Sequence, residues 1–217
     1  MKDNLKTESV VKAGKEAISI PAPNFQTITF KLKGTAPYVQ HRFSAKAKLE
    51  IKSKQMAGPT ARKGKKKEAR DFDAEYKAAM HISTDGWYGQ PAAGYRNAAI
   101  SACRTVGFAM TRAKLGLFIE ADGFDAEEGT PLIRIKGKPE QHEAHARIQN
   151  TTTIVVRPMW REWSVDLRVK FDADMFTASD VANLMMRIGQ QVGVGEGRPD
   201  SKTSCGMGWG TFEIVNT

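Results

Sequence analysis

The sequence of 217 residues lacks several features that would each point to a class of protein. It has two cysteines, Cys103 and Cys205, which excludes a disulfide scaffold and a structural zinc finger. No apolar run approaches the roughly 18 residues of a membrane-spanning helix, and the N-terminus lacks the apolar core of a signal peptide. We therefore expect a cytoplasmic protein with no membrane partner.

Motifs for common chemistry are also missing. There is no G-x-x-x-x-G-K-[ST] sequence, which excludes a Walker-type phosphate loop, and VGVGEG matches a dinucleotide motif only loosely. His142-Glu-Ala-His145 is one residue shorter than the HExxH of metalloproteases, and we interpret it as a solvated polar tract. We expect neither a metal nor a cofactor.

Positive charge is present and is concentrated in one segment. The formal net charge is +9, and residues 42–70 contain eleven basic residues and two acidic ones. This segment therefore accounts for the whole excess. Residues 58–70 contain Gly58, Pro59, Gly64 and no apolar side chain larger than alanine, which predicts a loop without a packed core. Basic side chains on such a loop neutralise phosphates, so we expect a nucleic-acid partner.

Hydrophobic periodicity predicts an α+β fold. Alternating apolar residues predict strands over 25–33, 115–121, 131–135, 153–160 and 162–171, and a final strand over 211–215. Helices are expected over 44–56, 72–81, 91–107 and 177–192. Pro91 is suited to the first helical position and Thr177 to an N-cap. A projecting hairpin or loop is expected over 137–152.

Without its insertions, this order is βαββαβ, the ferredoxin-like arrangement. We therefore predict a flexible N-terminal arm over 1–23. A single domain over 24–217 follows, with a basic segment over 42–82 inserted after the first strand and an extra β-hairpin between the two halves.

A second candidate binding element is the glycine-rich loop over 193–210. It contains six glycines, whose backbone can approach a ligand closely and whose N–H groups can bind an anion. It also carries Arg198 and Lys202, with Trp209 available to stack on a base. The alternative is an ordinary loop that joins a helix to a strand.

Three features together resemble the RAMP superfamily, ferredoxin-like RNA-binding proteins that form backbone subunits of CRISPR effector complexes. These features are the helix opening QPAAGYRNAA over 90–99, with Arg96 at its basic position, the glycine-rich loop, and the large insertion after the first strand. The chain is also similar to uncharacterised bacteriophage and prophage proteins in PYVQHRFS, RPMWREWSVDLRV and VGVGEGRP. The resemblance implies an RNA-binding, self-assembling subunit whose glycine-rich loop and first helix face the nucleic acid. The acidic residue with which some of these subunits cut RNA has no counterpart near His41 and Arg42.

The leading hypothesis is a phage-encoded, non-catalytic protein that binds single-stranded nucleic acid, RNA in preference to DNA, and assembles along it as a homo-oligomer. The predicted contact residues are Arg42, Arg62, Lys63, Lys65, Lys66, Lys67, Arg70, Arg96, Gly193, Gly195, Arg198, Lys202, Gly206, Gly208 and Trp209. One alternative is a metal-independent endoribonuclease with His41 as general acid or base. Another is a phage assembly protein or CRISPR inhibitor that binds a protein partner.

Overall fold

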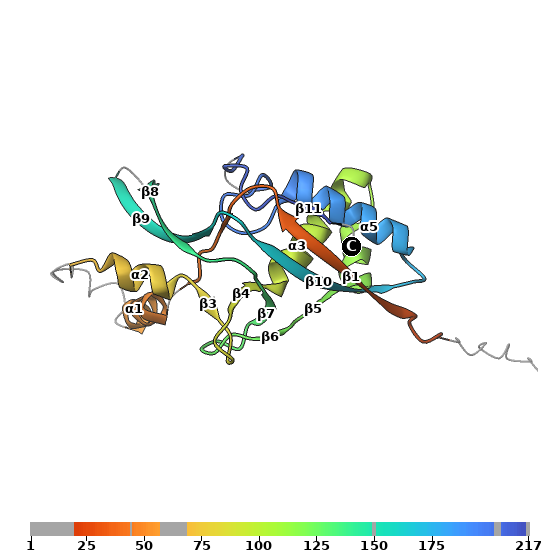
Figure 1. Ribbon diagram of the computed structural model, residues 1–217. Helices are drawn as coiled ribbons and strands as arrows, with labels where there is room; N and C mark the ends of the chain where they lie inside the picture. Colours follow the sequence, from red (N-terminus) through yellow and green to blue (C-terminus); the bar gives the residue numbers. More distant parts are fainter. Residues whose placement is uncertain (1–19, 44, 57–68, 149–150, 202–204, 216–217) are drawn as a thin grey trace, which may run out of the picture.

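A four-stranded antiparallel sheet with the spatial order β11-β1-β10-β5 forms the centre of the computed structural model (Figure 1). The structure describes residues 20–43, 45–56, 69–148, 151–201 and 205–215. The strands of this central sheet are β1 (Phe25–Gly34), β5 (Leu117–Glu120), β10 (Ser164–Asp172) and β11 (Phe212–Ile214). Strong alternation in the sequence produces β1 and β10, which pair from Phe25↔Asp172 to Lys33↔Ser164.

Two helices cover one face of the central sheet. They are α3 (Ala92–Ala102) and α5 (Ala178–Arg187), and α5 continues into a π-helical turn over Ile188–Val192. Their apolar side chains pack on the inward residues of β1 and β10, including Leu32, Leu167 and Val169, all of which are buried. Thr177 and Asp180 form the capping box of α5, as the sequence predicted.

Two further antiparallel sheets extend the molecule beyond the central sheet. One has the order β2-β9-β8, with β2 (Tyr38–Val39), β8 (Glu140–Ile148) and β9 (Thr151–Trp160). The other has the order β3-β4-β7-β6, with β3 (His81–Ile82), β4 (Tyr88–Pro91), β6 (Gly123–Phe124) and β7 (Pro131–Arg134). The hairpin of β8 and β9 projects from the body, as expected (Figure 1). The fold is therefore α+β with antiparallel sheets.

The remaining helices are α1 (Ala45–Met56), α2 (Phe72–Ala78) and α4 (Met110–Gly116). The first two belong to the segment inserted between β2 and β3. Leu49 and Ile51, the apolar residues of α1, are 66% and 43% exposed, so α1 has little contact with the core. Most of the predicted basic loop, residues 57–68, lies outside the described residues, as do residues 1–19 of the predicted arm.

Three local predictions need correction, and a fourth becomes more specific. The helix expected over 72–81 ends at Ala78, and β3 begins at His81. The strand expected from residue 115 begins at Leu117, because Ala113 and Gly116 are buried at the end of α4. Pro91 is the N-cap of α3 rather than its first residue. The tract from His142 to His145, interpreted only as a solvated polar tract, lies in strand β8, so its two histidines point to opposite faces of the strand.

Candidate nucleic-acid interface

A pocket of about 360 Å³ forms where three separate segments of the chain meet. One segment follows β2, the second is the junction of β4 and α3, and the third is the glycine-rich loop after α5. The walls come from Tyr38, Val39, Gln40, His41, His81, Gln90, Pro91, Gly94, Tyr95, Val194, Gly195, Glu196 and Arg198. Two of the elements that carry the family resemblance, the opening of α3 and the glycine-rich loop, therefore line one pocket.

The glycines hold the loop against the rest of the pocket. Gly193 and Gly195 have φ values of 69° and 83°, in the left-handed region that favours glycine. A Cβ on Gly195 would lie 2.6 Å from both the Tyr38 ring and the Val39 carbonyl oxygen. Backbone bonds close the loop, with the Glu196 N–H donating to the Val39 carbonyl at 2.9 Å. Since there is no room for a side chain at Gly195, this position requires glycine.

The rim of the pocket carries a group of three ionisable side chains. The Arg157 Nε donates to Glu196 at 2.9 Å, and its Nη2 lies 3.4 Å from the His41 Nδ1. The His41 Nδ1 is 3.7 Å from the Glu196 carboxylate. Burial lowers the pKa of His41 below its ordinary value of 6.5, and Arg157 lowers it further while Glu196 opposes the shift. At neutral pH His41 is therefore uncharged and able to accept a proton.

Arg198 is the predicted basic residue that lies on the pocket wall. Its Nη1 donates to the Gly195 carbonyl oxygen at 3.1 Å, which orients the guanidinium without neutralising its charge. The neighbouring Asp200 is bonded to Ser101 of α3 and to Arg104, which lies just after the end of α3 and whose Nη2 is 3.0 Å from both carboxylate oxygens. Arg157 pairs with Glu196, and Arg198 is a second guanidinium beside the pocket, close enough to Asp200 for its charge to lower the pKa of that carboxyl.

Arg42 has a structural role, which corrects the prediction that it contacts phosphate. The residue is 6% exposed, and its Nη2 lies 3.3 Å from Asp125 and 2.7 Å from Glu127. The His81 Nδ1 donates at 2.9 Å to the other Asp125 oxygen. Burial alone raises the pKa of Asp125. The hydrogen bonds from His81 and from the N–H groups of residues 127 and 128, together with the charge of Arg42, lower it below 3.8. We call Arg42, His81 and Asp125 the Asp125 cluster; of its three members His81 lines the pocket, and its bond to Asp125 fixes the ring there.

The other described basic candidates lie away from the pocket. Arg70 forms an ion pair with Glu75 and donates to the Ile154 carbonyl oxygen, and so joins α2 to β9. Arg96 donates to the carbonyl oxygens of Lys114 and Leu117 at 2.6 and 3.0 Å, at the edge of the central sheet. The structure therefore separates both residues from Arg198.

The second half of the glycine-rich loop turns toward the projecting hairpin. Trp209 is half-buried and meets the His142 ring edge-on, with 5.4 Å between centroids. Gly206 and Gly208 have φ values of 69° and 76°, and of these two only Gly208 has open space where a Cβ would lie. Trp209 is therefore already packed on one side by the protein.

Several of the predicted contact residues lie outside the described residues. They are Arg62, Lys63, Lys65, Lys66, Lys67 and Lys202. Within the described ranges, no three His, Cys, Asp or Glu side chains gather into a metal site, and no helix has both the length and the apolar character to cross a bilayer.

Sequence reasoning missed several residues that line this pocket or contact its lining. Gln40 donates to the Gly89 carbonyl oxygen at 2.8 Å, and Tyr95 bonds to the Gln90 side chain; both glutamines are buried. His81, Asp125 and Arg157 come from three different parts of the chain. Polar residues beside predicted strand ends were the only available signal, and that signal is weak in a polar sequence.

No family model matches the chain, and a search of curated proteins also finds no match. The resemblance to the RAMP superfamily therefore depends on the sequence motifs of this chain alone.

Proposed function

We propose that the chain is a non-catalytic protein that binds single-stranded nucleic acid, RNA in preference to DNA, and assembles along its ligand. The proposal includes a ferredoxin-like core of the RAMP type. Its support is the order of elements β1, α3, β5, β10, α5 and β11 along the chain, combined with the spatial order β11-β1-β10-β5. This is one strand-helix-strand unit followed by another, with both helices on the same face.

The observation that carries the proposal is the pocket between the glycine-rich loop and the start of α3. Arg198 supplies a cation, and the first turn of α3 supplies free backbone N–H groups because Pro91 forms no side-chain cap. A Cβ added to Gly94 would have no atom within 4 Å, so the helix surface there is open to a ligand. A phosphate of the bound strand fits this combination of charge and backbone donors.

The basic segment supplies the second part of the proposed interface. Lys63, Lys65, Lys66 and Lys67 add four charges to a strand held at the pocket. Contacts of this kind are independent of sequence and sensitive to salt. The pocket therefore fixes the path of the strand, and the segment raises affinity.

The test is fluorescence anisotropy of a labelled RNA of about 30 nucleotides, titrated with protein from about 50 to 400 mM salt. Changing Lys63, Lys65, Lys66 and Lys67 to alanine should reduce the salt slope by up to about 2.8, at about 0.7 for each phosphate contact on a single strand. Arg198→Gln should weaken binding, whereas Arg187→Gln on α5 should not. Absence of binding by the unmodified protein to RNA and to single-stranded DNA would overturn the proposal.

A second candidate function is RNA cleavage without a metal, favoured by the neutral His41 beside Arg157. In this reaction His41 accepts the proton of a ribose 2′-hydroxyl, whose oxygen attacks the adjacent phosphorus. The products are a 2′,3′-cyclic phosphate and a 5′-hydroxyl, whose leaving oxygen takes a proton from water. Cleavage of labelled RNA that disappears in His41→Ala and in a 2′-deoxy substrate supports this function, and intact RNA excludes it.

A further inference from the structure

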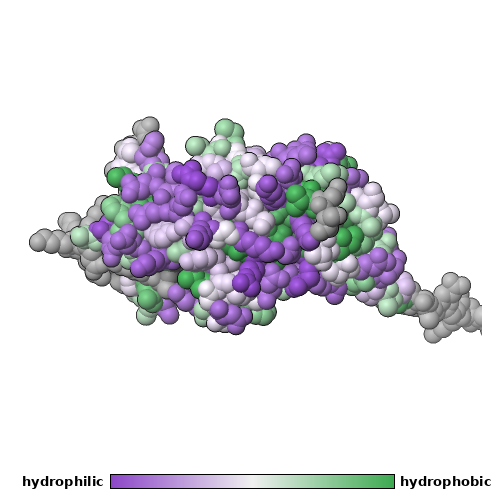
Figure 2. All heavy atoms as spheres, in the orientation of Figure 1, coloured by the Kyte–Doolittle hydropathy of each residue, from purple (hydrophilic) through white to green (hydrophobic). Residues whose placement is uncertain are grey.

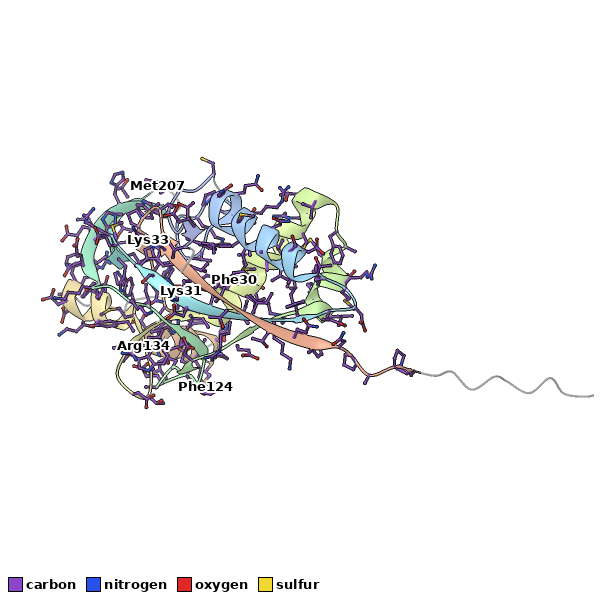
Figure 3. The ribbon with its side chains drawn as sticks, turned by 45° about the vertical axis from the view of Figure 1, so that its right-hand side comes forward. Phe30, Lys31, Lys33, Phe124, Arg134 and Met207 are labelled. Atoms are coloured by element: carbon purple, nitrogen blue, oxygen red, sulfur yellow. The ribbon has the colours of Figure 1, made fainter. Side chains whose placement is uncertain are left out.

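The face of the central sheet opposite α3 and α5 carries a row of polar, cationic and aromatic side chains. Along β1 the buried residues Phe30 and Leu32 alternate with exposed residues, which are Phe25, Thr27, Thr29, Lys31 and Lys33. On β10 the outward residues are Ser164, Asp166, Arg168 and Lys170. We call this surface the open sheet face. Lys31 and Lys33 follow one another along β1 in Figure 3, and Figure 2 shows the hydrophilic character of the surface in the orientation of Figure 1.

Two acidic side chains of the open sheet face, Asp166 and Glu120, are bonded to neighbours. Asp166 accepts from the Lys136 Nζ at 2.6 Å. Glu120 lies 3.4 Å from Arg168 and accepts from the Thr27 hydroxyl at 3.3 Å.

Among the described residues, Lys31, Lys33 and Lys170 form no ion pair, although Lys33 is opposite Glu213 in the register of β1 and β11. Three cations on this face therefore keep their charge available to an external anion.

Two aromatic rings lie at one end of the same face. Phe25 and Phe118 pack edge to face, with centroids 5.7 Å apart, and Phe25 is 37% exposed. Each ring has a cation over it. The Lys170 Nζ is 4.9 Å from the centroid of Phe25, and the Arg96 Cζ is 4.7 Å from that of Phe118. A base that stacks on Phe25 would bring its phosphate next to these cations.

The spacing along β1 suits an extended chain. Phe25 and Lys33 are eight positions apart, which is about 27 Å at the rise of an antiparallel strand. Aromatic rings and cations in one line are the combination that binds single strands with little sequence preference, by stacking and by phosphate neutralisation. A lipid surface is a poorer match, because Thr27 and Thr29 separate the rings from the lysines along β1.

We propose that the open sheet face is a second binding surface for single-stranded nucleic acid. Bases stack at Phe25 and Phe118, and phosphates contact Lys170, Lys31 and Lys33. This inference rests on the proposed function and adds to it a surface on the opposite side of the sheet from α3 and α5. It also gives Arg96 a role, as a cation fixed over Phe118 by its two bonds to backbone carbonyl oxygens.

The experiment compares three variants of the full chain by anisotropy with a labelled uridine oligomer of about 30 nucleotides. The lysine variant is Lys31→Gln, Lys33→Gln and Lys170→Gln, and the ring variant is Phe25→Leu and Phe118→Leu. A matched control removes three charges from the helical side through Arg112→Gln, Lys114→Gln and Arg187→Gln. Circular dichroism melting confirms that each variant is folded.

The lysine variant should reduce the salt slope by about 2, and the ring variant should weaken affinity about tenfold with the slope unchanged. The control should match the unmodified protein. If the unmodified protein binds and both face variants bind equally well, the open sheet face is not a nucleic-acid surface, while the proposed function stands. If the unmodified protein binds no single strand, both proposals are overturned. If the face variants bind the oligomer normally but lose a co-purifying protein, the surface contacts protein instead.

Discussion

The Asp125 cluster and the open sheet face both contain basic side chains, and they use them in opposite ways. In the cluster the Arg42 side chain is 5% exposed, and Asp125, at 1%, is one of its carboxylate partners. On the open sheet face Lys31 and Lys33 are exposed and form no ion pair within the described part of the chain. Arg42 follows Lys33 by only nine positions in the sequence.

A count of charges therefore does not measure the charge available to a partner. Arg42 belongs to the segment that holds the formal excess of positive charge, yet its charge is cancelled inside the fold. Lys31 and Lys33 lie outside that segment and are accessible. Burial and pairing, which depend on the tertiary structure, decide which cations reach a phosphate.

The largest expected effect comes from breaking the Asp125 cluster. Asp125→Asn removes the buried carboxylate partner of Arg42 and His81. Since Arg42 keeps Glu127 at 2.7 Å, we expect a loss in the free energy of unfolding of about 2–3 kcal/mol, below the roughly 3–5 kcal/mol of an uncompensated buried charge. Since the pKa of Asp125 is lowered, its contribution is complete above pH 3.8 and is lost as pH falls through that lowered pKa. Urea denaturation at neutral pH measures the loss.

The matched control is Asp166→Asn, which removes the partner of Lys136 on the open sheet face. Both side chains of that pair are about half exposed, so we expect a cost below about 1 kcal/mol. If Asp125→Asn and Asp166→Asn lower the free energy of unfolding by equal amounts, burial does not make the pairs of the Asp125 cluster more stabilising than the ion pair on the open sheet face.

A smaller effect is the difference in stability expected when two glycines of the glycine-rich loop are changed, one at a time, to alanine. Gly208 and Gly210 have φ values of 76° and 69°, so alanine at either position costs about 1–2 kcal/mol from the backbone conformation alone. A Cβ on Gly210 would also overlap the Val194 carbonyl oxygen, whereas Gly208 has open space. We expect Gly210→Ala to lower the free energy of unfolding by about 1–3 kcal/mol more than Gly208→Ala does.

The two alanine variants test whether the glycine-rich loop, like the Asp125 cluster, is tightly packed against the rest of the fold. Thermal unfolding followed by circular dichroism gives both stabilities under the same conditions. Similar melting temperatures for the two variants would contradict the close backbone approach between Gly210 and Val194.

Much of the fold could be predicted because its signals are local. The alternation from Val165 to Phe171 specifies a strand with one buried face, and the Thr177–Asp180 box specifies a helix start. The short helix α4 escapes such prediction because its seven residues give too little periodicity. Its position depends on the burial of Ala113 and Gly116.

The candidate site could be predicted only in part. The glycine-rich loop and Arg198 are predictable because glycine spacing and basic residues are visible in a sequence. The partners of Arg42 are not, because Asp125 lies 83 residues away and only the pairing of distant strands brings it close. The alternation of β1 predicts that Lys31 and Lys33 point outward, but nothing local indicates that Asp166, which lies opposite Lys31, is bonded to Lys136.

The smallest expected effect concerns His41, which lies between the two kinds of basic residue. Its pKa is below 6.5, so it is neutral in mildly alkaline solution and gains a positive charge as pH falls through that lowered value. Arg157, Glu196 and Arg198 surround it, and an added charge at this rim should strengthen RNA binding roughly two- to fivefold, the range of a partly exposed ion pair. Anisotropy at fixed salt, from about pH 7.5 down to about pH 5.0, measures this change. His41→Gln should abolish it and His145→Gln, on the exposed surface of β8, should leave it intact. If the affinity of His41→Gln still rises as pH falls, the titrating group lies elsewhere, and the charge of His41 does not contribute to RNA binding.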